Sequence, residues 1–161
     1  MSIPMTRVRA QGRAVLASLM LLLAAGVARA ALPEYDVKAA LLYKVSKFVS
    51  WPSTAASGSA FALCVIGSDP FGASLAGVGV SSIKGRRVKI LRYPSPNPDV
   101  QRCDVAFIST AESQRLTEVL ATLKGRPVLT ISDTPGFASR GGMIGLETRV
   151  NKIAFEVNVA A

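Results

Sequence analysis

The sequence has no histidine among its 161 residues and only two cysteines. Without histidine there can be no Ser-His-Asp or Cys-His arrangement, no His-ligated zinc site and no imidazole general base. The two cysteines do not form a C-x-x-C pair, which argues against a catalytic thiol. We therefore expect a protein that is not an enzyme, with no catalytic residues, no metal and no cofactor.

Acidic residues are absent from the first 30 positions, whose basic residues are Arg7, Arg9, Arg13 and Arg29. An apolar run over 14–27 precedes Ala28-Arg29-Ala30, which fits the small-residue rule for signal-peptide cleavage. A membrane anchor is the competing interpretation, but this run is shorter than the roughly 20 residues of a spanning helix. We expect a secretion signal peptide over 1–30, and a mature domain over 31–161 that does not itself span a membrane.

Removal of the four arginines in the signal leaves 15 basic against 10 acidic side chains, so the net charge falls from +9 to +5. This weakens a nucleic-acid interpretation, and we expect no nucleic-acid partner. The one basic cluster comprises Lys84, Arg86, Arg87, Lys89 and Arg92. We interpret it as a solvated strand edge, with contact to acidic lipid headgroups or an acidic partner as the alternative.

Periodicity predicts a helix over 34–49 whose buried face carries Val37, Leu41, Val45 and Phe48. A connector over 53–59 follows, and further helices are expected over 71–76 and 110–124. Strands are expected over 60–66, 85–93, 103–109, 127–132, 142–147 and 152–159. This order predicts one three-layer α/β sandwich domain, with a mainly parallel sheet and a C-terminal antiparallel hairpin at one edge.

Two cysteines in an exported chain permit one intramolecular disulfide, between Cys64 and Cys103. In the chain-entropy model, a disulfide that closes a loop of this length stabilises the fold by about 4 kcal/mol.

Asp133 follows a predicted strand at the sheet edge where ligands of α/β proteins collect, although an Asx-turn is an alternative role for it. The turn over 67–70, which contains Ser68, is interpreted as structural rather than as a phosphate loop.

Three motifs in order resemble the YfiR family of small periplasmic proteins: EYDVKAALLYKVSKFVSWP at 34–52, GFASRGGMIGL at 136–146 and IAFEVN at 153–158. The resemblance implies an α/β domain and a disulfide between positions that match Cys64 and Cys103. Some relatives carry a second cysteine pair near the GGMI segment, which is not cysteine here. Relatives usually continue past the last motif into a further helix, so this chain is either naturally short or a C-terminally truncated fragment.

By this resemblance, we expect a periplasmic repressor that binds the periplasmic domain of an inner-membrane diguanylate cyclase or a similar signalling protein. It would lower cyclic di-GMP output and thereby affect biofilm regulation, and a homodimer is plausible. The resemblance makes Glu156, Ile144 and Asn158 candidates for partner binding. The alternating pattern of 152–158 instead suggests that Glu156 lies on a solvated outer face. The alternative function is a small-molecule binding or sensor module with its ligand near Asp133 and Ser68.

Overall fold

The computed structural model describes residues 33–52, 60–150 and 152–161. The predicted signal peptide over 1–30 and the predicted connector over 53–59 lie outside the described residues. In the described part of the chain, no helix is long and apolar enough to cross a membrane.

Seven strands of the described chain form one sheet, in the spatial order β2-β3-β1-β4-β5-β6-β7. Their bounds are Ala60–Ile66 for β1, Ser82–Ile83 for β2, Arg86–Tyr93 for β3, Val105–Ile108 for β4, Leu129–Ser132 for β5, Ile144–Arg149 for β6 and Lys152–Val157 for β7. The helices are α2 at Glu34–Phe48, α3 at Ala76–Gly79 and α4 at Leu116–Leu123. Short 3-10 helices lie at Gly72–Leu75, Pro98–Arg102 and Thr110–Arg115.

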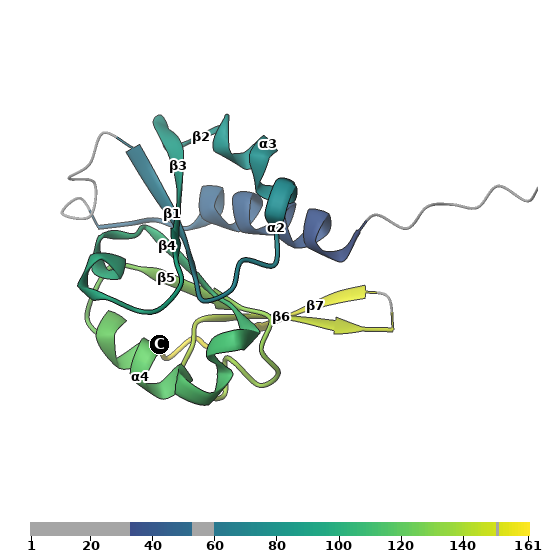
Figure 1. Cartoon of the computed structure of the whole chain (residues 1–161), viewed down its shortest axis with the longest axis vertical. Helices are drawn as coiled ribbons and strands as arrows, with labels where there is room; N and C mark the ends of the chain where they lie inside the picture. Colours follow the sequence, from purple (N-terminus) through teal and green to yellow (C-terminus); the bar gives the residue numbers. More distant parts are fainter. Residues whose placement is uncertain (1–32, 53–59, 151) are drawn as a thin grey trace, which may run out of the picture. The chain divides into compact units, whose positions relative to one another are not determined.

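The central strands β3, β1, β4, β5 and β6 pair in parallel, whereas β2 and β7 pair antiparallel at the two edges. In Figure 1, α2 and α3 lie on one side of the sheet and α4 on the other. The predicted fold class is therefore confirmed, including the C-terminal hairpin formed by β6 and β7. The short β2 is not predicted, because two residues are too few to give a periodic signal.

Alternate residues of the central strands face opposite helical layers, so both faces of the sheet are buried. In β1, Leu63 and Val65 belong to the core beneath α2, whereas Cys64 and Ile66 belong to the core beneath α4. The disulfide between Cys64 and Cys103 lies in this second core, with the two Cα atoms 6.0 Å apart. It links β1 to the segment that leads into β4.

The first helix begins and ends close to the predicted positions, but a different face of it is buried. Phe48, the last member of the predicted face, is 86 % exposed. The buried positions are instead Lys38, Ala39, Leu42 and Ser46. The hydroxyl of Ser46 donates to the carbonyl of Leu42 at 2.6 Å, and Lys38 forms an ion pair described below. Both polar side chains can be buried because they have hydrogen-bond or ion-pair partners. A pattern of apolar residues does not predict the burial of such polar side chains.

The prediction that the basic cluster is a solvated strand edge is wrong at Arg86, because the side chain of this residue is only 18 % exposed. Its guanidinium donates to both oxygens of Asp104, at 2.6 and 2.9 Å, in a bidentate pair. Asp104 also accepts the backbone N–H of Ala62 at 2.8 Å, and its carbonyl accepts the indole N–H of Trp51 at 3.1 Å. This network anchors the chain after α2 to the amino-terminal ends of the central strands.

The two glycines before β6 have different roles in the turn into that strand. Gly141 has a φ of +98°, which is a left-handed conformation that favours glycine. At Gly142, an added Cβ atom would lie 2.1 Å from the ring of Phe137, which is fully buried. Gly141 is therefore required for its backbone conformation, and Gly142 is required because no side chain fits against the ring of Phe137.

Candidate functional site

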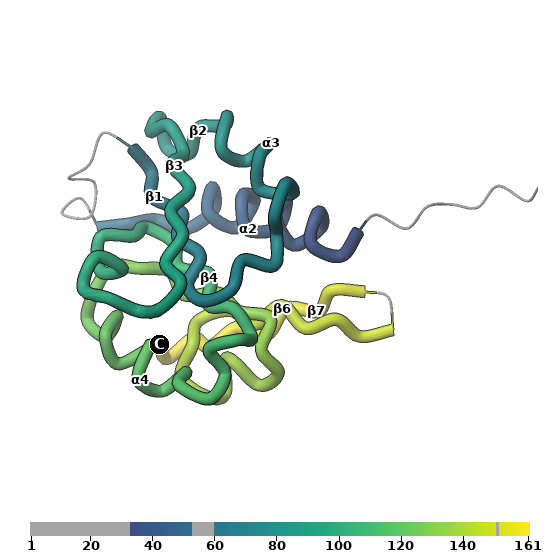
Figure 2. The backbone as a smooth tube through the Cα atoms, in the orientation of Figure 1, coloured from purple at the N-terminus to yellow at the C-terminus, as the bar shows by residue number. Residues whose placement is uncertain are grey.

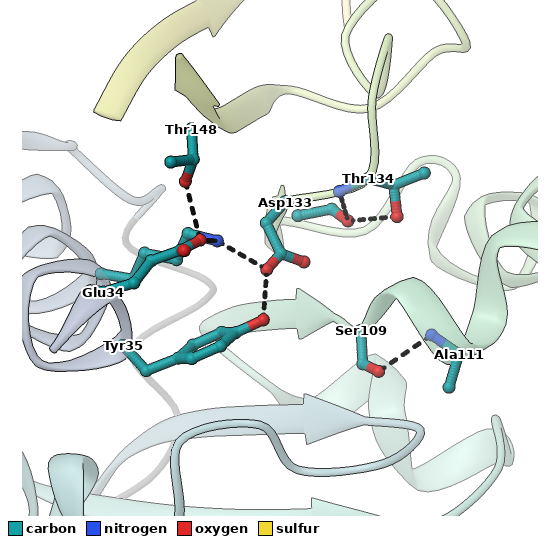
Figure 3. Close-up of polar contacts among 9 residues, drawn as sticks. Glu34, Tyr35, Ser109, Ala111, Asp133, Thr134 and Thr148 are labelled. Carbon is teal, nitrogen blue, oxygen red and sulfur yellow. Dashed lines mark hydrogen bonds and ion pairs between the residues drawn. The ribbon is translucent and has the colours of Figure 1, made fainter. Parts of the chain in front are cut away.

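Asp133 follows β5 directly, at the carboxyl ends of the parallel strands where the sequence places a candidate ligand site. Its side chain is 4 % exposed and accepts two hydrogen bonds on Oδ2 (Figure 3). The hydroxyl of Tyr35 donates at 2.9 Å, and the ammonium of Lys38 donates at 2.8 Å. Both donors come from the start of α2, so Asp133 ties that helix to the end of β5.

The same network reaches the C-terminal hairpin. Lys38 also forms an ion pair with Glu34 one helical turn earlier, and the hydroxyl of Thr148 on β6 donates to Glu34 at 2.7 Å. The chain path in Figure 2 brings the start of α2 beside the β6–β7 hairpin, although these segments are more than 100 residues apart. One buried ammonium thus holds α2, β5 and β6 together through two carboxylates.

The pKa shifts in this network keep its charges fixed near neutral pH. Burial, followed by the hydrogen bond to Asp133, raises the pKa of the Tyr35 hydroxyl, so the tyrosine stays protonated and donates. The hydrogen bond from Lys38, followed by that from Thr148, lowers the pKa of Glu34, so this carboxyl stays ionised. These two groups act as a fixed donor and a fixed anion, not as proton-transfer groups.

The second oxygen of the Asp133 carboxylate is buried and has no hydrogen-bond partner among the described residues. Figure 3 shows it pointing away from Tyr35 and toward Thr134. A hollow of about 260 Å³ lies at this carboxylate, lined by Glu34, Lys38, Asp133, Pro135, Glu147 and Thr148. Three carboxylates and one ammonium give the lining a net negative charge. A ligand with a positive charge therefore suits this hollow best.

The Asx-turn role considered for Asp133 is not what the structure contains. The side chain of Ser132 accepts the backbone N–H of Thr134 at 3.0 Å and donates to the hydroxyl of Thr134 at 2.9 Å. The turn after β5 is therefore closed by the serine before Asp133, and the Asp133 carboxylate is used for contacts with α2 instead.

Ser68 and Asp133 are not brought together. Ser68 follows β1 and is exposed, while β4 lies between β1 and β5 in the sheet. In the same turn, Asp69 accepts the backbone N–H of Phe71 at 2.8 Å and pairs with Arg92 at 2.7 Å. The contacts of Asp69 are those of a structural turn, as interpreted from the sequence.

The three candidate partner-binding residues lie on two faces of the hairpin. Ile144 pairs with Val157 on the face beneath α2, and its 8 % exposure leaves little side chain for direct contact. Glu156 pairs with Gly145 on the opposite face and is half-buried, with Oε2 enclosed and lacking a hydrogen-bond partner among the described residues. The amide of Asn158 donates to the carbonyl of Ala138 at 3.1 Å.

The predicted exposure of the β7 faces is therefore wrong. Phe155 and Val157 are 47 % and 60 % exposed, whereas Glu156, on the face expected to be solvated, is half-buried. The reason is that β7 is an edge strand lying beyond the cover of α2, which contacts β6 through Glu34 and Thr148. The apolar side chains nearest the end of β7 thus remain uncovered on the α2 side of the sheet.

Together, the fold and this site define a small three-layer α/β domain, in which a buried ion pair joins the first helix to the sheet beside an acidic hollow. Among the described residues, no three His, Cys, Asp or Glu side chains gather as a metal site. Residues 35–161 match the family model described as YfiR/HmsC-like, and the chain belongs to this family. The resemblance drawn from the three motifs is thereby confirmed. Proteins of the family are periplasmic and are in general non-catalytic regulators.

Proposed function

We propose that this chain is exported to the periplasm, binds an inner-membrane signalling protein and represses it. The candidate partner is the periplasmic domain of a diguanylate cyclase, and repression would lower cyclic di-GMP output. Membership of the YfiR/HmsC-like family over residues 35–161 is the observation that carries this proposal. The first 30 residues support export, because basic residues, an apolar run and a small-residue cleavage site follow one another as in a signal peptide.

The proposed contact surface is the C-terminal hairpin, where Glu156 lies near the end of β7 and Asn158 follows that strand directly. Ile144 would contribute indirectly, because it supports Val157, its cross-strand neighbour, which is 60 % exposed. Burial of this exposed apolar edge would stabilise a complex, and the carboxylate beside it would favour a partner of complementary charge.

Repression would work by a shift of population between two states of the partner. A regulator that binds the inactive conformation more tightly than the active one favours the inactive state by that difference in affinity. Loss of the regulator then releases the cyclase activity on the other side of the membrane. The regulator itself needs no catalytic group for this role.

Co-purification from the native envelope tests the proposal. The tagged, exported chain is captured from solubilised membranes, and the retained membrane proteins are identified by mass spectrometry. We expect a membrane signalling protein that Glu156→Lys weakens and that Glu118→Lys, a charge reversal at an exposed position of α4, leaves in place. Recovery of no membrane protein with the unaltered chain would contradict the proposal.

The negative charge of the hollow at Asp133 favours a second candidate function, a sensor of small cationic molecules with N–H donors. Ethanolammonium and choline are a matched pair of probes, because both carry a positive charge and a hydroxyl but choline has no N–H group. We expect ethanolammonium to raise the melting temperature and choline to leave it unchanged. Glu34→Gln should reduce the shift, and Asp36→Asn, an exposed acid of the same helical turn, should not. Equal shifts with both probes would contradict a site of this chemistry.

A further inference from the structure

Charged side chains are distributed unevenly between the two ends of the parallel strands. Asp69, Glu112 and Asp133 lie shortly after β1, β4 and β5, at the carboxyl ends. The amino-terminal ends instead carry exposed basic side chains. The last turn of α2 also lies on this side, because the indole of Trp51 donates to the carbonyl of Asp104 just before β4. We call these exposed basic residues the basic end: Lys47, Lys84, Arg87, Arg102, Lys124 and Arg126.

The positive charge of the basic end is not neutralised by the chain itself. In the part of the chain that the structure describes, none of its members forms an ion pair. Asp104, the buried carboxylate on this side, is already paired with Arg86. The exposed Asp99, three residues before Arg102, offsets only part of the charge. An anionic partner therefore suits this end of the molecule.

We propose that the basic end docks on the surface of a bilayer that contains anionic phospholipids. Its charges are on long, exposed side chains spread over the ends of several segments, which cannot fix the geometry of a small anion. A fluid layer of headgroups needs no fixed geometry, and each Lys or Arg near it strengthens binding about fivefold. The proposal rests on the proposed function only for export, which would bring the chain to such a surface.

Phe48 adds an apolar group to the same region. It follows Lys47 at the end of α2, and its side chain is 86 % exposed. A bilayer surface suits a ring beside an ammonium, because the ring can enter the boundary between headgroups and acyl chains while the ammonium contacts phosphate. Such a surface would thus cover the side chain that the fold of α2 leaves exposed.

Docking through the basic end would direct the C-terminal hairpin away from the bilayer. The hairpin extends beyond the carboxyl end of β5, because only Ile144 and Gly145 of β6 pair with that strand. Figure 1 shows the end of α2 and the hairpin on opposite sides of the sheet. The proposed contact surface would then stay accessible to a protein domain that extends from the same membrane.

Flotation with protein-free vesicles tests the proposal separately from repression. The exported chain is mixed with vesicles of phosphatidylcholine alone, or with one third phosphatidylglycerol. We expect binding only to the anionic vesicles, weakened by salt. Arg87→Glu/Arg126→Glu should weaken it at least about 25-fold. Arg140→Glu/Lys152→Glu, exposed basic positions on the carboxyl side, changes the net charge equally and should have little effect. Equal losses in the two variants would overturn the proposal. So would an unaltered chain that does not bind, the result expected if an acidic protein occupies this end.

Trp51 reports the orientation on the bilayer, because it is the only tryptophan in the sequence. We expect its fluorescence to be quenched by phosphatidylglycerol that carries bromine on its acyl chains. Trp51→Phe/Val150→Trp moves the single tryptophan to the hairpin, where Val150 is 95 % exposed, and should show much weaker quenching at equal vesicle binding. Phe48→Ala should weaken binding severalfold, whereas Val150→Ala should not. Quenching at position 150 as strong as at Trp51 would overturn the proposed orientation and with it the proposal.

Discussion

Replacement of Lys38 by methionine tests the physical account of the Asp133 network most sharply. The ammonium of Lys38 and the carboxylate of Asp133 are 2.8 Å apart, with side chains 3 % and 4 % exposed. Methionine keeps most of the apolar stem of the lysine but removes its charge. The buried carboxylate would then retain only the hydrogen bond from Tyr35. Removing one partner of a buried pair leaves an uncompensated charge, so we expect a loss of about 3–5 kcal/mol in the free energy of unfolding.

The hairpin provides a matched control for this substitution. Arg149 and Glu147 also form an ion pair, at 2.6 Å, but the arginine side chain is 69 % exposed. Because exposed ion pairs contribute little to the free energy of unfolding, Arg149→Met should cost far less than Lys38→Met. Lys38→Met/Asp133→Asn removes both buried charges and should recover most of the stability. Urea denaturation of the four proteins measures these differences. A Lys38→Met loss no larger than that of Arg149→Met, or no recovery in the double variant, would refute the reasoning.

Three further predictions concern the disulfide, the GG turn and Glu34. Cys64→Ser should cost about 4 kcal/mol of stability and weaken partner binding through that loss, so an unchanged melting temperature with abolished binding would contradict it. Gly142→Ala should cost about 1–3 kcal/mol in urea denaturation, because its methyl group would overlap the ring of Phe137. The lowered pKa of Glu34 gives stability that is present above its ordinary pKa of 4.5 and is lost as the pH falls through the folded-state pKa. On acidification below about pH 5, the unaltered chain should therefore lose more stability than Glu34→Gln, and equal losses would contradict this assignment.

Much of the architecture could be predicted because it depends on local signals. β1 and β4 are short, continuous apolar runs between turn residues, which is typical of strands buried on both faces. The sequence predicts one helix over 110–124, and the side chain of Ser109 accepts the N–H of Ala111 at its start, at 3.1 Å. This first part is a 3-10 helix, and α4 proper begins only at Leu116. Propensity alone does not separate these two helical forms.

The candidate site was only partly predictable, because its contacts join distant parts of the chain. Asp133 was assigned from its place after a strand, but its partners Tyr35 and Lys38 lie 98 and 95 positions earlier. Nothing near Lys38 in the sequence distinguishes a buried lysine from a solvated one. For the same reason, the sequence pattern did not predict which face of α2 is buried. It also gave the reverse of the observed exposure of Phe155 and Glu156, since the cover of β7 depends on where α2 begins.

The proposed function requires that the exported chain represses a membrane protein that makes cyclic di-GMP. Measuring intracellular cyclic di-GMP in the native host, with and without this gene, tests it most directly. We predict that the nucleotide rises when the gene is deleted and returns to its original level when the full chain is restored. A chain that lacks residues 1–30 should fail to restore it. An unchanged level of cyclic di-GMP in the deletion strain, under conditions in which the gene is expressed, would contradict the account.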